Sequence, residues 1–180
     1  GIAAFGTVPG FEDRYDSGRR PTRCYVPRFR NVTDRDERFL RGFAYQGGAD
    51  RPDWKRGAGA SGFGADFKES LRRPAPWVFA ISAFGEMLPD ARNGVHLDEK
   101  KTDNWGIPLL HVECEHGDND RAMMKAMSAD AVEMLEAIGL SNVRSTKGNA
   151  PPGLLVHEMG TARMGHDPAT SVLNRHNQAH

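Results

Sequence analysis

The stretch Trp77-Val-Phe-Ala-Ile-Ser-Ala-Phe84 is a continuous apolar run in a chain that is frequently interrupted by glycine and proline. Pro74 and Pro76 bound the run on one side, and Pro89 bounds it on the other. An apolar run of strand length between such residues is typical of a strand that is covered on both faces. We therefore predict a central strand of a sheet over 77–84.

Aromatic side chains recur at period two just upstream of this run. Phe39, Arg41, Phe43 and Tyr45 fall on one side of an extended chain, and smaller residues fall on the other. This alternation predicts a strand with a buried aromatic face. The mixing of arginine with aromatics, which begins at Arg23, could instead mark a surface for single-stranded nucleic acid.

The other elements are predicted from helical spacing and turn residues. Residues 46–75 are rich in Gly, Asp and Arg and are expected to form a loop, whereas 94–97 and 107–114 are expected to form strands. Apolar residues at helical spacing predict a helix over 119–138, and Gly139 is placed to end it. The chain is therefore expected to be an α+β protein, with an antiparallel sheet and one packed helix.

Composition narrows the classes of function. The 180 residues carry 24 Lys+Arg and 24 Asp+Glu, a formal net charge of zero, which argues against a chain-wide nucleic-acid or membrane-surface role. No apolar run approaches the roughly 20 residues of a membrane span. Two cysteines, Cys24 and Cys114, are too few for a disulfide framework and leave the compartment undecided.

Gly57-Ala-Gly-Ala-Ser-Gly62 matches the G-x-G-x-x-G pattern of dinucleotide-binding loops. That pattern binds pyrophosphate only between a buried strand and a helix. The preceding residues, 50–56, are too polar for a buried strand, and 63–66 do not open a good helix. We therefore interpret this stretch as a surface or substrate-side loop.

His111-Val-Glu-Cys-Glu-His116 concentrates potential metal ligands in six positions. On a strand, His111, Glu113 and Glu115 share one face, while Cys114 and His116 share the other. The set cannot converge on one ion without a bend, and the spacing of a zinc finger is absent. A half-exposed strand is the favoured interpretation, and no metal site is expected.

The strongest motif is Gly153-Leu-Leu-Val-His-Glu-Met-Gly-Thr-Ala-Arg-Met-Gly165. It predicts a short strand over 154–156 that ends at His157 and runs into a turn of small residues. Glycine lets a backbone approach a flat, bulky group. A histidine at such a strand end is a candidate general base, although it could also be a hydrogen-bonded structural histidine.

This motif also carries a resemblance to a known family. His157-Glu-Met-Gly-Thr-Ala-Arg-Met-Gly165, followed by Asp167-Pro168 and 170–172, closely resembles the C-terminal signature of the glucose–methanol–choline (GMC) family of flavoprotein oxidoreductases. Three upstream segments look like parts of the substrate domain of its bacterial sugar dehydrogenase branch: Tyr25–Asn31, Arg41–Phe43 and Asn104–Leu109.

The resemblance implies an activity and a role for one residue. It implies an FAD-dependent dehydrogenase or oxidase that acts on the CH–OH group of an alcohol, sugar or polyol. His157 would take the hydroxyl proton while hydride passes to flavin N5. The implied partners are this small-molecule substrate and an electron acceptor, which could be a protein; a nucleic-acid partner is not expected.

The resemblance also implies a division of the chain. Residues 1–153 would belong to the substrate-binding domain, and 154–180 would begin a catalytic segment that returns to an FAD domain. FAD would be bound mainly by regions absent from these 180 residues, so no cofactor-binding residue is assigned. The second catalytic residue of the family, a His or Asn, would fall beyond His180. We therefore expect the isolated fragment to bind no flavin stably and to be inactive.

Two other classes of function remain open at this point. One is a non-catalytic, β-rich carbohydrate-binding or interaction module that uses exposed aromatics at Trp54, Phe63 and Trp77. The other is a nucleic-acid module that uses the Arg/aromatic stretch, with strongly salt-dependent binding. The first would give His157 no function, and the near-zero net charge argues against the second.

Overall fold

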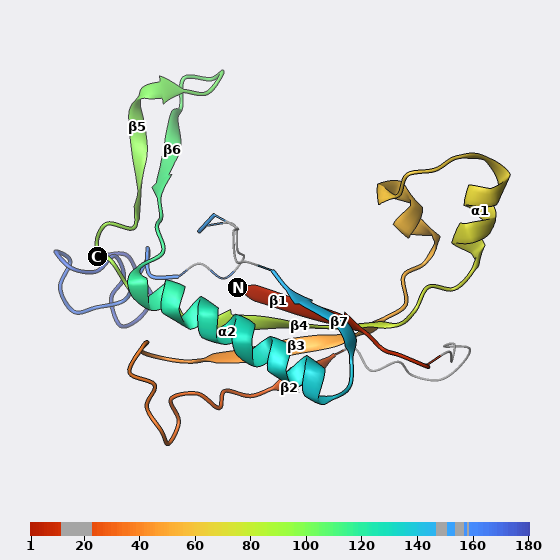
Figure 1. Ribbon diagram of the computed structural model, residues 1–180. Helices are drawn as coiled ribbons and strands as arrows, with labels where there is room; N and C mark the ends of the chain where they lie inside the picture. Colours follow the sequence, from red (N-terminus) through yellow and green to blue (C-terminus); the bar gives the residue numbers. More distant parts are fainter. Residues whose placement is uncertain (12–22, 147–150, 154–156, 158) are drawn as a thin grey trace. The chain divides into compact units, whose positions relative to one another are not determined.

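A computed structural model of the chain describes residues 1–11, 23–146, 151–153, 157 and 159–180 (Figure 1). These residues contain seven strands, two α-helices and one 3-10 helix. They divide into two compact units. The first comprises Gly1–Glu86 and Asn119–Asn149, and the second comprises Met87–Asp118 and Ala150–His180. No helix in the described ranges combines the length and apolar character needed to cross a membrane.

The first unit is built on a five-stranded antiparallel sheet. Its strand order is β2-β3-β4-β1-β7. The strands are β1 (Ile2–Thr7), β2 (Cys24–Val26), β3 (Phe43–Asp50), β4 (Val78–Gly85) and β7 (Ser141–Ser145). The predicted central strand is confirmed, because β4 forms from the 77–84 run and lies between β3 and β1.

The strand expected near Phe39 begins later than predicted. Arg41 has a positive φ of 70°, which interrupts extended chain, and β3 starts at Phe43. It then continues to Asp50, so the prediction of a loop from residue 46 is wrong at this point. Gly47 is required by close packing within the sheet, because a Cβ there would overlap the carbonyl oxygen of Ala80 on β4.

Helix α2 (Asp118–Ala137) covers one face of this sheet (Figure 1). Its Met123, Met127 and Leu135 share a buried core with strand residues that include Phe43 and Tyr45. Burial raises the pKa of the Tyr45 hydroxyl, which therefore stays protonated and donates a hydrogen bond of 2.8 Å to the Met127 carbonyl. The predicted helix and its packing are confirmed, and with them the α+β class.

The predicted end of this helix is also confirmed. Gly139 adopts a φ of 82°, a conformation that glycine adopts without steric cost. Its N–H donates to the Glu136 carbonyl at 2.9 Å, and the Leu140 N–H donates to the Leu135 carbonyl at 3.1 Å. These two bonds satisfy carbonyls that a helix end leaves open.

The loop before β3 is fastened to α2 by one ion pair. Arg30 donates from Nε and Nη2 to the two carboxylate oxygens of Asp130, at 2.8 and 2.6 Å. Asp130 is buried, and this paired geometry compensates the loss of its hydration. Phe29 packs against Phe43 and Tyr45. The Arg/aromatic pattern therefore includes side chains that hold the fold together.

The 46–75 stretch also contains two helices, which the sequence did not predict. The 3-10 helix η1 spans Trp54–Gly59, and α1 spans Gly64–Arg72. The expectation that no helix opens after residue 63 is therefore wrong. However, the first half of the Gly57–Gly62 stretch lies within η1, and no strand leads directly into it, so the context of a dinucleotide loop is missing among the described residues.

The second unit contains an antiparallel hairpin of β5 (Gly94–Thr102) and β6 (Pro108–Glu113). Its connecting turn is held by Asp103, whose carboxylate accepts hydrogen bonds from the N–H groups of Trp105 and Ile107, at 2.8 and 2.9 Å. Every residue of β6 is exposed, so the prediction of a half-exposed strand is wrong in this respect. Residues 159–180 of this unit form a series of turns.

Candidate functional site

His157 is exposed and follows a turn at Gly153, whose φ is 84°. The strand predicted over 154–156 lies outside the described residues, as does Glu158. The structure therefore places the side chain of the predicted base at a surface and not in a packed core. The imidazole of His157 is therefore not enclosed by the described part of the chain.

The residues after His157 fold into a compact set of backbone turns. Gly160 has a φ of 99°, a backbone conformation that side-chain-bearing residues rarely adopt. Leu173 is the central residue: its carbonyl accepts from Gly165 N–H at 2.8 Å, and its N–H donates to the Arg163 carbonyl at 3.1 Å. Leu173 also forms bridges with Met164 and Ala179. These bonds fix the glycine-rich turn that begins beside His157.

Ser171 is a buried polar residue within this segment. Its hydroxyl donates to the Asp167 carbonyl at 2.7 Å and lies 3.0 Å from Nε2 of His180. Ser171 packs against Gly165, where a Cβ would lie 2.6 Å from the Ser171 Cβ and 2.7 Å from its Oγ. The motif glycine at 165 is therefore required by close packing.

Replacing Gly165 by Ala should disrupt this segment. The added methyl group would overlap Ser171, and relief of that overlap costs about 1–3 kcal/mol in a packed site. Hydrogen exchange should show faster exchange of the Gly165 and Leu173 amides. Gly94→Ala is the matched control, because its Cβ would meet nothing within 4 Å. Unchanged exchange in Gly165→Ala would show that the packing does not hold the turn.

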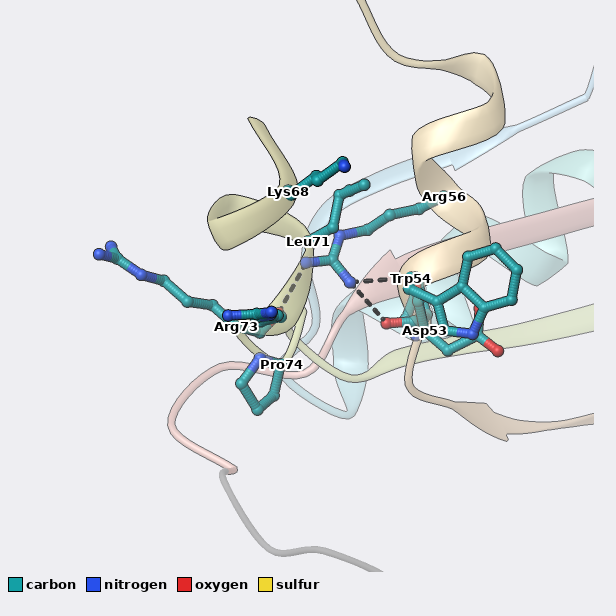
Figure 2. Close-up of a pocket in the computed structure, with 9 residues that line it drawn as sticks. Asp53, Trp54, Arg56, Lys68, Leu71, Arg73 and Pro74 are labelled. Carbon is teal, nitrogen blue, oxygen red and sulfur yellow. Dashed lines mark hydrogen bonds between the residues drawn. The ribbon is translucent and has the colours of Figure 1, made fainter. Parts of the chain in front are cut away.

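A hollow lies between η1 and α1 in the first unit (Figure 2). Arg56 lies at its wall, but its guanidinium donates to four backbone carbonyls, those of Pro52, Asp53, Ser70 and Arg73. These bonds join the two helices. The hollow contains none of the residues predicted to be catalytic, so it is a structural junction and not the candidate site.

The carbohydrate-binding alternative requires Trp54, Phe63 and Trp77 to be exposed, and only two of them are. Trp77 is only 3% exposed and packs edge-on to Phe11 at 6.1 Å between ring centroids. Trp54 and Phe63 are exposed, at 68% and 94%. A buried ring cannot stack on a sugar, so the expectation that Trp77 joins the other two is wrong.

The sequence pointed to one side-chain site and missed another grouping. His157 is the one predicted catalytic residue, and the described residues bring no second predicted one to it. The structure does bring His111 and Glu113 together with His96 on the neighbouring strand. Alternation along the strand predicted that His111 and Glu113 share a face. Which residue of β5 lies opposite His111 depends on strand register, which the sequence did not reveal.

Comparisons with known proteins support the family resemblance that the His157 motif carries. Residues 89–180, just over half of the chain, match the family model described as GMC oxidoreductase. A 2-methyl-1,2-propanediol dehydrogenase from Mycolicibacterium austroafricanum is 37% identical over 99 residues, which are 54% of this chain and 18% of that protein. The fructose dehydrogenase large subunit from Gluconobacter japonicus is 28% identical over 117 residues, 65% of this chain and 21% of that subunit.

The matched region contains His157 and the whole glycine-rich turn that follows it. The chain belongs to the GMC oxidoreductase family, as the motif predicted. It spans about a fifth of the length of the curated relatives it matches.

Proposed function

We propose that the full-length protein is an FAD-dependent oxidoreductase that oxidises the CH–OH group of a sugar, polyol or related alcohol. The observation that carries the proposal is His157, an exposed imidazole at the start of a fixed glycine-rich turn, inside the region that matches the family. Both relatives are named as dehydrogenases, one of a diol and the other of fructose, which supports a substrate with several hydroxyl groups.

His157 is the proton acceptor in this proposal. A neutral imidazole can accept a hydrogen bond from a substrate hydroxyl, orient it and then take its proton. Loss of that proton places negative charge on the oxygen, which makes departure of hydride from the adjacent carbon easier. The bound flavin would supply the redox chemistry as the hydride acceptor.

The described residues fit one side of a flavin and not a whole FAD. His157, Met159 and Gly160 are exposed, and a Cβ on Gly160 would meet nothing within 4 Å, so the backbone there is open to a flat ring. A glycine-rich loop between a strand and a helix, which binds pyrophosphate, is absent from the described ranges. We therefore propose that 154–180 meets the flavin ring and that other parts of the full-length protein hold the rest.

We further propose a division of the chain at residue 153. Residues 1–153 would belong to the substrate domain, and 154–180 would return to the FAD domain. The electron acceptor, whether a small molecule or a protein, would bind to another part of the full-length protein.

The experiment is anaerobic reduction of the purified full-length protein. We expect a visible flavin spectrum that is bleached by one or more members of a panel of 1,2-diols, polyols and sugars that includes fructose. Simple hydrocarbons that lack the hydroxyl should leave it unchanged. A protein that carries no flavin, or whose flavin no alcohol reduces, would contradict the proposal.

A further inference from the structure

The β5–β6 hairpin has two chemically different faces. Register pairs Val95 with Val112 and Leu97 with Leu110, so apolar side chains from both strands share one face. His96 pairs with His111 on the opposite face. Because side chains alternate along a strand, Glu113 lies on the same face as His111. The polar face of this hairpin thus collects two imidazoles and one carboxylate.

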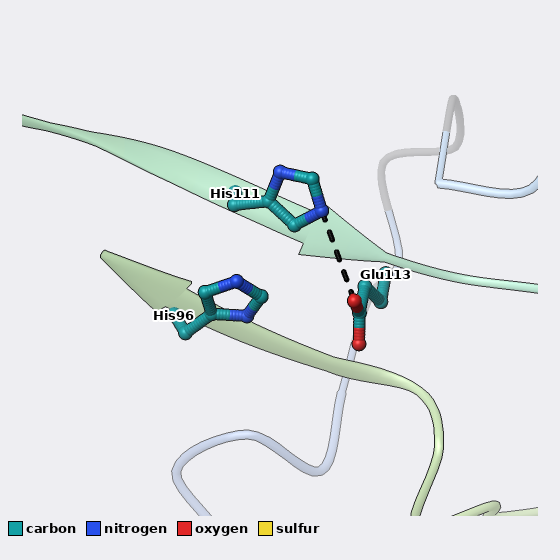
Figure 3. Close-up of side chains that lie close together, drawn as sticks. All are labelled: His96, His111 and Glu113. Atoms are coloured by element: carbon teal, nitrogen blue, oxygen red, sulfur yellow. Dashed lines mark ion pairs between the residues drawn. The ribbon is translucent and has the colours of Figure 1, made fainter. Parts of the chain in front are cut away.

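These three side chains lie close together (Figure 3). The rings of His96 and His111 have centroids 4.7 Å apart, and Nε2 of His111 lies 3.8 Å from Oε1 of Glu113. One possible ligand atom from each residue lies within 4.8 Å of the other two. All three side chains are exposed, so small rotations about their side-chain bonds meet little resistance.

We propose that His96, His111 and Glu113 bind a divalent transition-metal ion of the zinc type. Two imidazole nitrogens and a carboxylate oxygen are ligands that zinc prefers, at about 2.0–2.2 Å from the ion. Tetrahedral geometry at that bond length separates ligand atoms by about 3.3 Å. Side-chain rotation must therefore draw the three atoms together by about 1.5 Å at most, and water completes the coordination.

The simpler explanation, an ion pair between His111 and Glu113, accounts for only part of the arrangement. It does not involve His96, whose ring faces that of His111 across the ladder. A metal ion would take a nitrogen lone pair from each imidazole as well as a carboxylate oxygen, so it accounts for all three side chains. The metal would also link β5 to β6. Such a link would stabilise the hairpin, because every residue of β6 is exposed and none is held by burial.

This inference goes beyond the proposed oxidoreductase activity and does not depend on it. It also departs from the sequence-based expectation that no metal would bind here. That expectation weighed only ligands on one strand. His96 comes from the neighbouring strand, and the pairing register brings it opposite His111.

The test is titration of metal-stripped, full-length protein with zinc chloride in a calorimeter. We expect a binding event that His96→Ala and His111→Ala each weaken at least about tenfold, with a similar loss in Glu113→Gln. His176→Ala is the matched control, because it removes an exposed histidine of the same unit that lies outside the cluster. Circular dichroism would establish that each variant is folded.

Hydrogen exchange provides a second readout that is local to the site. Zinc should slow exchange of β5 and β6 amides in the wild type and in His176→Ala, but not in His96→Ala. Zinc binding that is equally tight in the wild type and in a His96→Ala/His111→Ala double variant would overturn the proposal. So would the absence of zinc-dependent protection of the hairpin in the wild type at saturating zinc.

Discussion

The His157→Ala variant of the full-length protein should retain bound flavin but reduce it with alcohol about 10²–10⁴-fold more slowly than the wild type. The substitution removes the proposed proton acceptor, so hydride would have to leave a carbon whose hydroxyl group is still protonated. His157 is exposed, so the change removes little packing. Stopped-flow absorbance under anaerobic conditions measures flavin reduction separately from later electron transfer.

Two comparisons make this result specific. His166→Ala removes another exposed histidine, nine residues further along the same segment, and should leave the rate of flavin reduction close to that of the wild type. The flavin content of both variants should match that of the wild type. A His157→Ala protein that reduces its flavin at the wild-type rate would show that this histidine is not the proton acceptor.

Phe43→Ala should lower the free energy of unfolding by about 3–5 kcal/mol. Phe43 is 2% exposed, begins β3 and contacts the rings of Phe39 and Tyr45 at centroid distances of 6.0 and 5.6 Å. Its loss leaves a cavity between the sheet and α2 that the neighbouring rings cannot fully occupy. Urea unfolding followed by circular dichroism measures the change.

Phe63→Ala is the matched control for this substitution. It makes the same chemical change at a side chain that is 94% exposed, and the expected loss is within about 0.5 kcal/mol. Equal destabilisation by the two variants would contradict the placement of Phe43 in the buried core. The comparison therefore tests whether the sheet and α2 share the buried cluster described above.

The parts of the fold that follow from local residue patterns could be predicted. The 77–84 run predicted β4 because a continuous apolar run of strand length between prolines favours an inner strand of a sheet. The apolar stripe of α2 and its end at Gly139 follow from helical periodicity and from the conformational freedom of glycine. In each case the residues that determine the element lie within it or close beside it along the chain.

The parts that depend on neighbouring elements could not be predicted. Residues 46–50 are rich in glycine and resemble a loop, yet they extend β3, because Gly47 lets β4 approach closely. Helix α1 is only nine residues long, buries none of them and begins without a side-chain cap, so this polar stretch was interpreted as loop. The grouping of His96 with His111 depends on strand register, which the spacing of residues along the chain does not reveal.

The candidate catalytic residue was predicted from a motif and not from geometry. Physical reasoning identified His157 as either a base or a structural histidine, and the resemblance to the GMC family favoured the base. The structure adds that the side chain is exposed and that the following turn is fixed by Leu173 and Ser171. The role of Gly165 in accommodating Ser171 required the folded turn to be seen.

Chemical rescue tests most directly whether His157 accepts the substrate proton. The measurement is the rate of anaerobic flavin reduction in the full-length His157→Ala variant as imidazole is added, with His166→Ala as control. A small base that occupies the vacated position can take the same proton. We expect a rate that rises with the concentration of neutral imidazole in His157→Ala and stays constant in His166→Ala. A slow His157→Ala rate that does not respond to imidazole would contradict it.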